Sequence, residues 1–164
     1  MTALALYQRQ VSEQRRIRDR LLAGLGDVDA LWQPGPDLPC ATWHLLHAAF
    51  TNAATFLGQG DDDWSLLSAP LCAAFNIGSP VSTATTLPTL GEARAQVAIW
   101  DAACAARMAR QDDLHHALRA PRPGWLPDGC ATWFDAMAYM LPHEAFHHGE
   151  IALLRRLRGL PRLE

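Results

Sequence analysis

The chain has 164 residues and a mass of 18.0 kDa, with 49% hydrophobic and 19% charged residues and a formal net charge of −3. This composition indicates one globular domain over residues 1–164 and excludes a disordered chain. Every basic residue is Arg, and these residues are scattered among Asp and Glu, which argues against a nucleic-acid-binding surface.

The N-terminal segment and the cysteines indicate the compartment. MTALALYQRQVSEQRRIRDR lacks the features of a signal peptide, and no segment approaches the roughly 18 uninterrupted apolar residues of a membrane span. We therefore expect a cytoplasmic protein. Cys40, Cys72, Cys104 and Cys130 include no C-x-x-C pair, and in a reducing compartment we expect small buried side chains rather than disulfides.

Hydrophobic periodicity predicts four long helices, separated by segments rich in Pro and Gly. In the first helix the apolar stripe is imperfect and consists of Leu4, Tyr7, Val11, Leu21 and Leu25. The third begins at Thr89-Leu90-Gly91-Glu92, which has the spacing of a capping box. The helices are expected at residues 3–24, 40–57, 89–118 and 131–157.

The longest predicted connection covers residues 58–88 and is interrupted by a short helix at 64–75. A connection of that length can cross the whole bundle, so neighbouring helices need not be antiparallel. No sustained period-2 alternation predicts a strand. The sequence therefore predicts an all-α fold, a four-helix bundle with a long crossover connection.

The segment LPHEAFHHGE, residues 141–150, places two histidines one helical turn apart. His143 and His147 lie about 40° apart on a helix with about 100° per residue, so their rings can converge on one ion. The apolar residues expected on the same face are Ala136, Tyr139, Met140, Phe146, Leu154 and Leu157. Two neighbouring imidazoles in the bundle interior need partners, which a divalent metal would provide. The alternative is two unrelated core histidines bonded to backbone or water.

The same segment matches the H-E-x-x-H pattern of zinc proteases, with Glu144 in the place of the catalytic base. In the metzincin form of that pattern, Gly and a third His would follow at positions 150 and 153, where this sequence has Glu150 and Leu153. Other proteases of this type take a downstream Glu as the third metal ligand, but after Glu150 the only carboxylate side chain here is that of Glu164. In addition, no strand is predicted that would hold a peptide substrate. The sequence thus argues against proteolysis and for a third ligand upstream.

The upstream candidate is His47, in the stretch CATWHLLHAAFTNAATFL of the second helix. It shares a face with Trp43 and Phe50, which suit a pocket. Alone, His47 is best interpreted as a core histidine, but together with the downstream pair it becomes the better candidate for a ligand. His44, about 60° away, is expected at an exposed helix start or as a substitute ligand. The remaining histidines are expected elsewhere, His115 and His116 in the last turn of the third helix and His148 at the surface or on the flank of its helix.

Two blocks of the sequence together resemble the DinB-like family, which includes YfiT-type proteins and the bacillithiol transferases. HEAFHHGEIALLRRLRGLP is similar to the family's C-terminal signature H-E-x-x-H-R-G-Q-I-x-x-x-L-R-x-x-G, and LWQPGPDLPCATWHLLHAAFTNAATFLG resembles its second-helix block, in which a single His follows a capped helix start. The order of elements matches over the whole chain. His148 and Glu150 stand where the family has Arg and Gln, which leaves the substrate open.

The resemblance implies a bundle of up-down-down-up topology in which His47, His143 and His147 bind Zn²⁺ or Ni²⁺. It also implies a homodimer. Several characterised relatives are metal-dependent transferases that attach a low-molecular-weight thiol such as bacillithiol to an electrophile. Others resemble mycothiol-dependent isomerases, and many have no known reaction.

We therefore expect a metal-dependent thiol S-transferase acting in stress or detoxification, with a small-molecule thiol and an electrophile as its partners. Trp43, Phe50 and Tyr139 are expected to line the pocket. Glu150, about 20° from the direction of His143, is expected to orient a ligand or to act as a base, unless it pairs with an Arg near the helix end. Two alternatives stay open: a metal-dependent hydrolase or isomerase with Glu150 as base, and a non-catalytic metal-stabilised module.

Overall fold

The computed structural model describes residues 2–59, 64–75, 87–111, 113–118, 124 and 126–161. In these ranges every regular element is helical, and β structure is limited to an isolated bridge between Ala117 and Thr132. The long helices are α1 (Ala3–Leu22), α3 (Ala41–Phe56), α5 (Leu90–Ala109) and α6 (Trp133–Leu157). The shorter elements are α2 (Asp27–Ala30), η1 (Leu57–Gln59), η2 (Trp64–Leu66) and α4 (Ala69–Phe75). The all-α prediction is confirmed.

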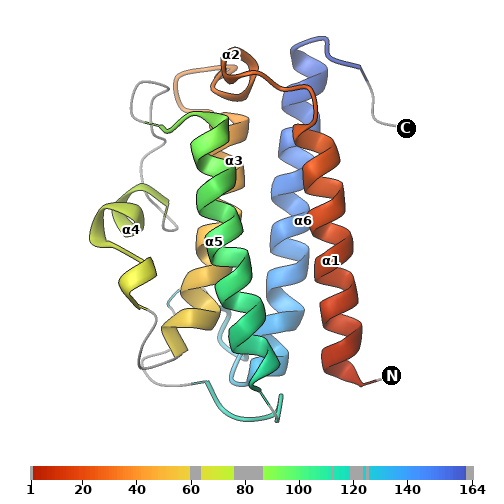
Figure 1. Cartoon of the computed structure of the whole chain (residues 1–164), viewed down its shortest axis with the longest axis vertical. Helices are drawn as coiled ribbons and strands as arrows, with labels where there is room; N and C mark the ends of the chain where they lie inside the picture. Colours follow the sequence, from red (N-terminus) through yellow and green to blue (C-terminus); the bar gives the residue numbers. More distant parts are fainter. Residues whose placement is uncertain are drawn as a thin grey trace.

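The four long helices lie side by side along the long axis of the molecule (Figure 1). α3 packs against both α5 and α6, and α1 packs against α6. In this view α1 and α6 run upward, whereas α3 and α5 both run downward. The short helix predicted at residues 64–75 is present as two pieces, η2 and α4.

Threonine side chains begin three of the long helices. Thr2 accepts a hydrogen bond from the first turn of α1. Thr89 and Glu92 form the predicted capping box at the start of α5. A second capping box, between Thr132 and Asp135, begins α6. These side chains provide partners for N–H groups that have none within the helix.

α6 carries two of the predicted ligands as one continuous element. It runs without a break through Pro142, although that residue has no backbone N–H to donate. Gly159 follows it with a φ of +71°, a left-handed conformation that favours glycine after a helix. Because the helix is unbroken, His143 and His147 keep the spacing of one turn that the sequence predicts.

The predicted end of the third helix at residue 118 is wrong, because α5 ends at Ala109. The chain after α5 runs beside the start of α6, where Trp133 N–H donates to His116 O at 3.2 Å and Phe134 N–H donates to Leu114 O at 2.7 Å. This segment thereby provides acceptors for the first turn of α6. His115 and His116 consequently lie in an exposed connection and not in a last helical turn.

The core lies between the long helices and contains several aromatic pairs. Phe56 stacks on Trp133 with ring centroids 5.9 Å apart and meets Tyr7 edge-on at 6.2 Å. Phe50 meets Trp100 edge-on at 5.9 Å. These contacts join α1, α3, α5 and α6, and such pairs add stabilisation beyond the burial of their area.

The cysteines that the structure describes are buried and lie outside any disulfide, as predicted: Cys40, Cys104 and Cys130. The side chain of Cys72 lies outside the described part of the chain. Among the described helices, none combines the length and the apolar character that crossing a membrane requires.

Candidate metal centre

Three histidines from two helices converge in the structure. His47 comes from α3, and His143 and His147 come from α6. One ring nitrogen from each residue lies within 4.8 Å of those of the other two. The spacing on α6 and the upstream position on α3 both pointed to this group, and the three side chains are close enough to bind a metal ion.

The separation of the ring nitrogens fits a small divalent ion. Nε2 of His147 lies 3.3 Å from Nε2 of His143. Two nitrogens at about 2.1 Å from a tetrahedral zinc ion would be about 3.4 Å apart. The separation of these two nitrogens is therefore close to that of two ligands of one ion.

His47 is already oriented for a role as ligand. Its Nδ1 lies 2.7 Å from the backbone oxygen of Phe75 in α4. A carbonyl oxygen only accepts, so Nδ1 carries the proton and Nε2 has the free electron pair. Trp43 stacks on the ring, with centroids 4.6 Å apart and planes within 8° of parallel. The hydrogen bond fixes the tautomer, and the stacking fixes the plane of the ring.

Burial keeps the three rings in the form that binds metals. It lowers the pKa of His47, and together with the neighbouring histidine it lowers the pKa of His143 to about 4. Burial, with the surrounding histidines, lowers the pKa of His147 to about 2. All three rings are thus neutral at pH 7. A neutral imidazole has one unprotonated nitrogen, which can bind a cation without first losing a proton.

His44 lies beside this group but does not belong to it. It is 6% exposed, so the expectation of an exposed position at the helix start is wrong. Its Nδ1 lies 3.0 Å from Nδ1 of His147, the nitrogen on the side of the ring away from His143. Among the described residues the group close enough to bind one ion contains His47, His143 and His147, without His44.

The aromatic residues expected to line the pocket divide into two sets. Trp43 contacts the rings of His47 and His147, and Tyr139 lies over His143 with centroids 6.4 Å apart. Phe50, in contrast, is 1% exposed and packs into the core against Trp100. The structure therefore brings Trp43 and Tyr139 to the histidines and leaves Phe50 with the core.

Two residues expected on the inner face of α6 point outward. Phe146 is 61% exposed and Leu157 is 57% exposed. The buried residues of α6 instead are Trp133, Ala136, Met137, Met140, Glu144, His147, His148, Ile151, Leu154 and Arg155. Apolar residues occur on several sides of this helix, so its neighbours and not its own periodicity decide which side is buried. Phe146 still meets the ring of His147 edge-on, at a centroid distance of 5.2 Å.

Glu150, the predicted catalytic carboxylate, is half-buried on α6. Among the described residues it is not part of the group close enough to share one ion. The alternative for Glu150 was an ion pair with an Arg near the end of the helix. Arg158, one such residue, pairs instead with Asp29 at 2.7 Å. The role of Glu150 therefore stays a prediction.

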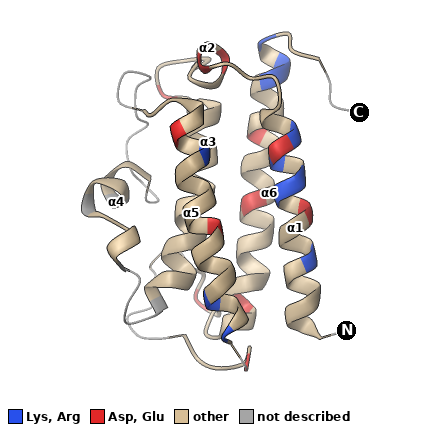
Figure 2. Ribbon diagram, viewed as in Figure 1, with Lys and Arg blue, Asp and Glu red and all other residues tan. Residues whose placement is uncertain are grey.

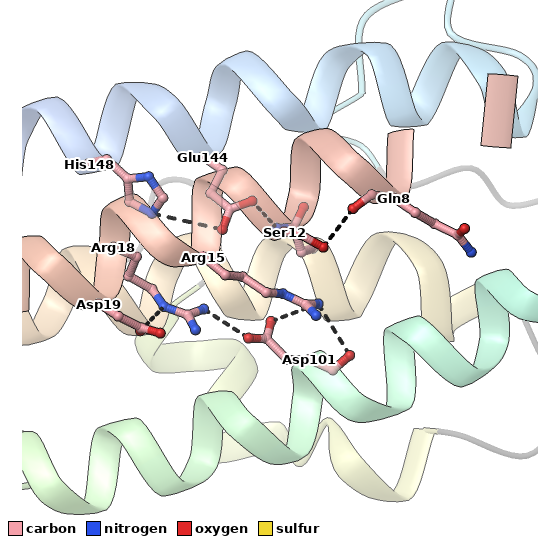
Figure 3. Close-up of polar contacts among 9 residues, drawn as sticks. Gln8, Ser12, Arg15, Arg18, Asp19, Asp101, Glu144 and His148 are labelled. Atoms are coloured by element: carbon pink, nitrogen blue, oxygen red, sulfur yellow. Dashed lines mark hydrogen bonds and ion pairs between the residues drawn. The ribbon is translucent and has the colours of Figure 1, made fainter. Parts of the chain in front are cut away.

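Glu144, the protease-like residue, points into the bundle toward α1 (Figure 3). It is 6% exposed, accepts a hydrogen bond from Asn52 Nδ2 at 3.4 Å, and has His148 Nε2 at 3.8 Å. Burial raises the pKa of this carboxyl to about 7. A protease base must face a substrate at the metal, so the placement of Glu144 argues against proteolysis, in agreement with the sequence.

Charged residues of both signs occur along α1, α5 and α6 (Figure 2). Polar side chains of these helices meet between them and form a polar layer (Figure 3), which consists of Arg15, Arg18, Asp101, Glu144 and His148. Asp101 accepts from Arg18 at 2.9 Å and from Arg15 at 3.3 Å, which joins α5 to α1. His148 is 5% exposed, with its Nδ1 3.0 Å from Gln14 Oε1, so its expected surface position is wrong.

This layer was missed in the sequence, although the stripe of the first helix contained a signal. Between Val11 and Leu21 the predicted stripe has no apolar residue. Gln14 and Arg18 lie in that gap at spacings of three and four residues, on the side of the helix that faces its neighbours. A gap in an otherwise regular stripe thus marked polar residues that face into the bundle.

No family model matches the chain, and no curated protein matches it either. The resemblance to the DinB-like family therefore rests on the two sequence blocks, and the case for a metal centre rests on the three converging histidines.

Proposed function

We propose that this chain is a divalent-metal-binding protein of the DinB-like type, with a Zn²⁺ or Ni²⁺ ion held by His47, His143 and His147. The observation that carries the proposal is the convergence of three neutral imidazoles from α3 and α6, two of them buried and that of His143 half-buried, with ligand atoms within 4.8 Å of one another. The helix directions in Figure 1 agree with the up-down-down-up topology that this family would require.

The reaction that we propose is transfer of a low-molecular-weight thiol, such as bacillithiol, to a small electrophile. When bound, a divalent ion with open coordination positions would supply Lewis acidity, which lowers the pKa of a thiol. With an alkyl halide, the sulfur forms a bond to carbon, the halide leaves with the bonding pair, and the thiol proton passes to a base. Glu150 is proposed as that base, and Trp43 and Tyr139 as the walls against which the electrophile lies.

The wider setting is part of the same proposal. A transferase of this kind would act in the cytoplasm as a homodimer and protect the cell from reactive electrophiles. A metal-dependent hydrolase or isomerase that uses the same histidines, and a metal-stabilised module without catalysis, are the alternatives that the experiment must separate.

The test begins with the metal content of the purified protein and its affinity for Zn²⁺ and Ni²⁺. We expect one ion per chain in the wild type and none in His143→Ala. The matched control is His116→Ala, because His116 is exposed in the connection before α6 and should not affect the metal. A wild type that binds neither ion, or a His47→Ala variant with unchanged affinity, would refute the metal site.

The second measurement addresses the reaction. The loaded protein is assayed for conjugation of a bromobimane-type electrophile with bacillithiol, mycothiol, glutathione and cysteine. Turnover with one thiol that is lost in His143→Ala and kept in His116→Ala supports the transferase. Stoichiometric metal without turnover of any thiol contradicts the transferase and favours the hydrolase, isomerase or non-catalytic alternatives.

A further inference from the structure

His44 touches one of the candidate ligands without being close enough to join the group. It lies on α3, close to one turn before His47, so the same helix provides both a ligand and this neighbour. The ring of His44 meets Trp43 edge-on at 5.5 Å, and its Nδ1 lies 3.0 Å from Nδ1 of His147 on α6. The contact therefore joins the two helices that build the candidate centre.

The direction of this hydrogen bond decides which nitrogen of His147 is free. A neutral imidazole carries one N–H, so of the two Nδ1 atoms one donates and the other accepts. If His44 donated, the proton of His147 would lie on Nε2, the atom that faces His143 at 3.3 Å. If His147 donates, its Nε2, which lies 3.3 Å from Nε2 of His143, has a free electron pair.

We propose that His44 is a positioning residue, whose Nδ1 accepts the Nδ1–H of His147 and thereby leaves Nε2 of His147 free for a metal. This inference rests on the proposed metal site and extends it to a residue outside the ligand group. His44 does for His147 what the Phe75 carbonyl does for His47, where Nδ1–H donates at 2.7 Å. Residues that orient metal-binding histidines in this way commonly affect the affinity for the metal about 10- to 100-fold.

His143, the other candidate ligand on α6, differs from His147 in the surroundings of its Nδ1. Within the part of the chain that the structure describes, the buried Nδ1 of His143 has no hydrogen-bond partner, so at this atom the ring receives no such support. Of the two ligands on α6, His147 is thus the one whose Nδ1 is held by a neighbouring side chain. His44 is in turn held in position by its own burial and by Trp43.

Two variants separate orientation from packing. His44→Phe keeps a ring in the buried space but has no acceptor. His44→Asn places Oδ1 near the position of the histidine Nδ1 and can still accept. We expect His44→Phe to weaken Zn²⁺ binding about 10- to 100-fold in competition with a chromogenic chelator, and His44→Asn to restore most of that loss. His116→Phe, an exchange at an exposed histidine, serves as control and should leave the affinity unchanged.

The spectroscopic test uses long-range ¹H–¹⁵N correlation spectra of the histidine rings, with His147 assigned through His147→Gln. The metal-free wild type should show His147 protonated on Nδ1, and the Nε2-protonated form should gain population in His44→Phe. Protonation of His147 on Nε2 in the wild type, or unchanged Zn²⁺ affinity in His44→Phe, would overturn the inference. A wild type that binds no metal but carries the Nδ1 proton would refute the proposed function and leave the orientation by His44 standing.

Discussion

Replacing Glu144 with glutamine should stabilise the metal-free protein at alkaline pH and have little effect in mild acid. Glu144 is 6% exposed, and burial raises its pKa from 4.5 to about 7. Glutamine has nearly the same shape and keeps an oxygen that can accept from Asn52 Nδ2, but it cannot ionise. The substitution therefore removes the charge of this side chain with little change in packing.

The magnitude follows from the two pKa values. Between pH 4.5 and 7 the unfolded chain has lost this proton while the folded protein keeps it, so the contribution of Glu144 to the stability of the wild type falls as the pH rises through that window. One pKa unit corresponds to about 1.4 kcal/mol, which makes the ionised carboxylate unfavourable by about 3 kcal/mol above pH 7. Glu144→Gln should thus exceed the wild type by up to about 3 kcal/mol at pH 8 and by less than about 1 kcal/mol at pH 5.

The assay is urea denaturation followed by circular dichroism, with EDTA present, at several pH values from 5 to 8. The quantity compared is the difference in free energy of unfolding between variant and wild type, because contributions of other groups then cancel. The matched control is Glu150→Gln, which removes a carboxylate at a half-buried position of the same helix. If Glu144→Gln is no more stable than the wild type at pH 8, the carboxylate is stabilised by Arg15 and Arg18 to a degree that outweighs its burial.

Two further predictions concern the buried histidines and a helix cap. Burial lowers the pKa of His143 and His148 to about 4 and that of His147 to about 2, so the unfolded chain takes up protons near pH 6.5 that the folded protein excludes. The metal-free protein should therefore lose several kcal/mol of stability as the pH falls from 6.5 toward 4; a melting temperature equal at pH 7.5 and pH 5 would contradict this. Thr132→Ala removes the hydroxyl that caps α6 with Asp135, and in urea denaturation it should cost about 1 kcal/mol, whereas Thr132→Ser should restore most of it.

Much of the fold could be predicted because its signals are local. The capping box at Thr89 and Glu92 depends on residues three apart in the chain, and it is present. The pairing of His143 with His147 depends only on the helical repeat. The end of α5 could not be predicted in this way, because the residues after Ala109 leave the helix to supply backbone acceptors to the start of α6.

By itself, the sequence determined that the chain is helical and that two histidines share one face of its last long helix, since periodicity and caps act over a few residues. Only the tertiary structure decided what surrounds them. The packing of α3 against α6 brings His47 and His44 to the pair. The packing of α1 against α6 buries Glu144 and His148 in the polar layer, while Phe146 stays exposed. Which side of an amphipathic helix is buried, and which nitrogen of a buried ring is free, depend on neighbours that lie far away in the chain.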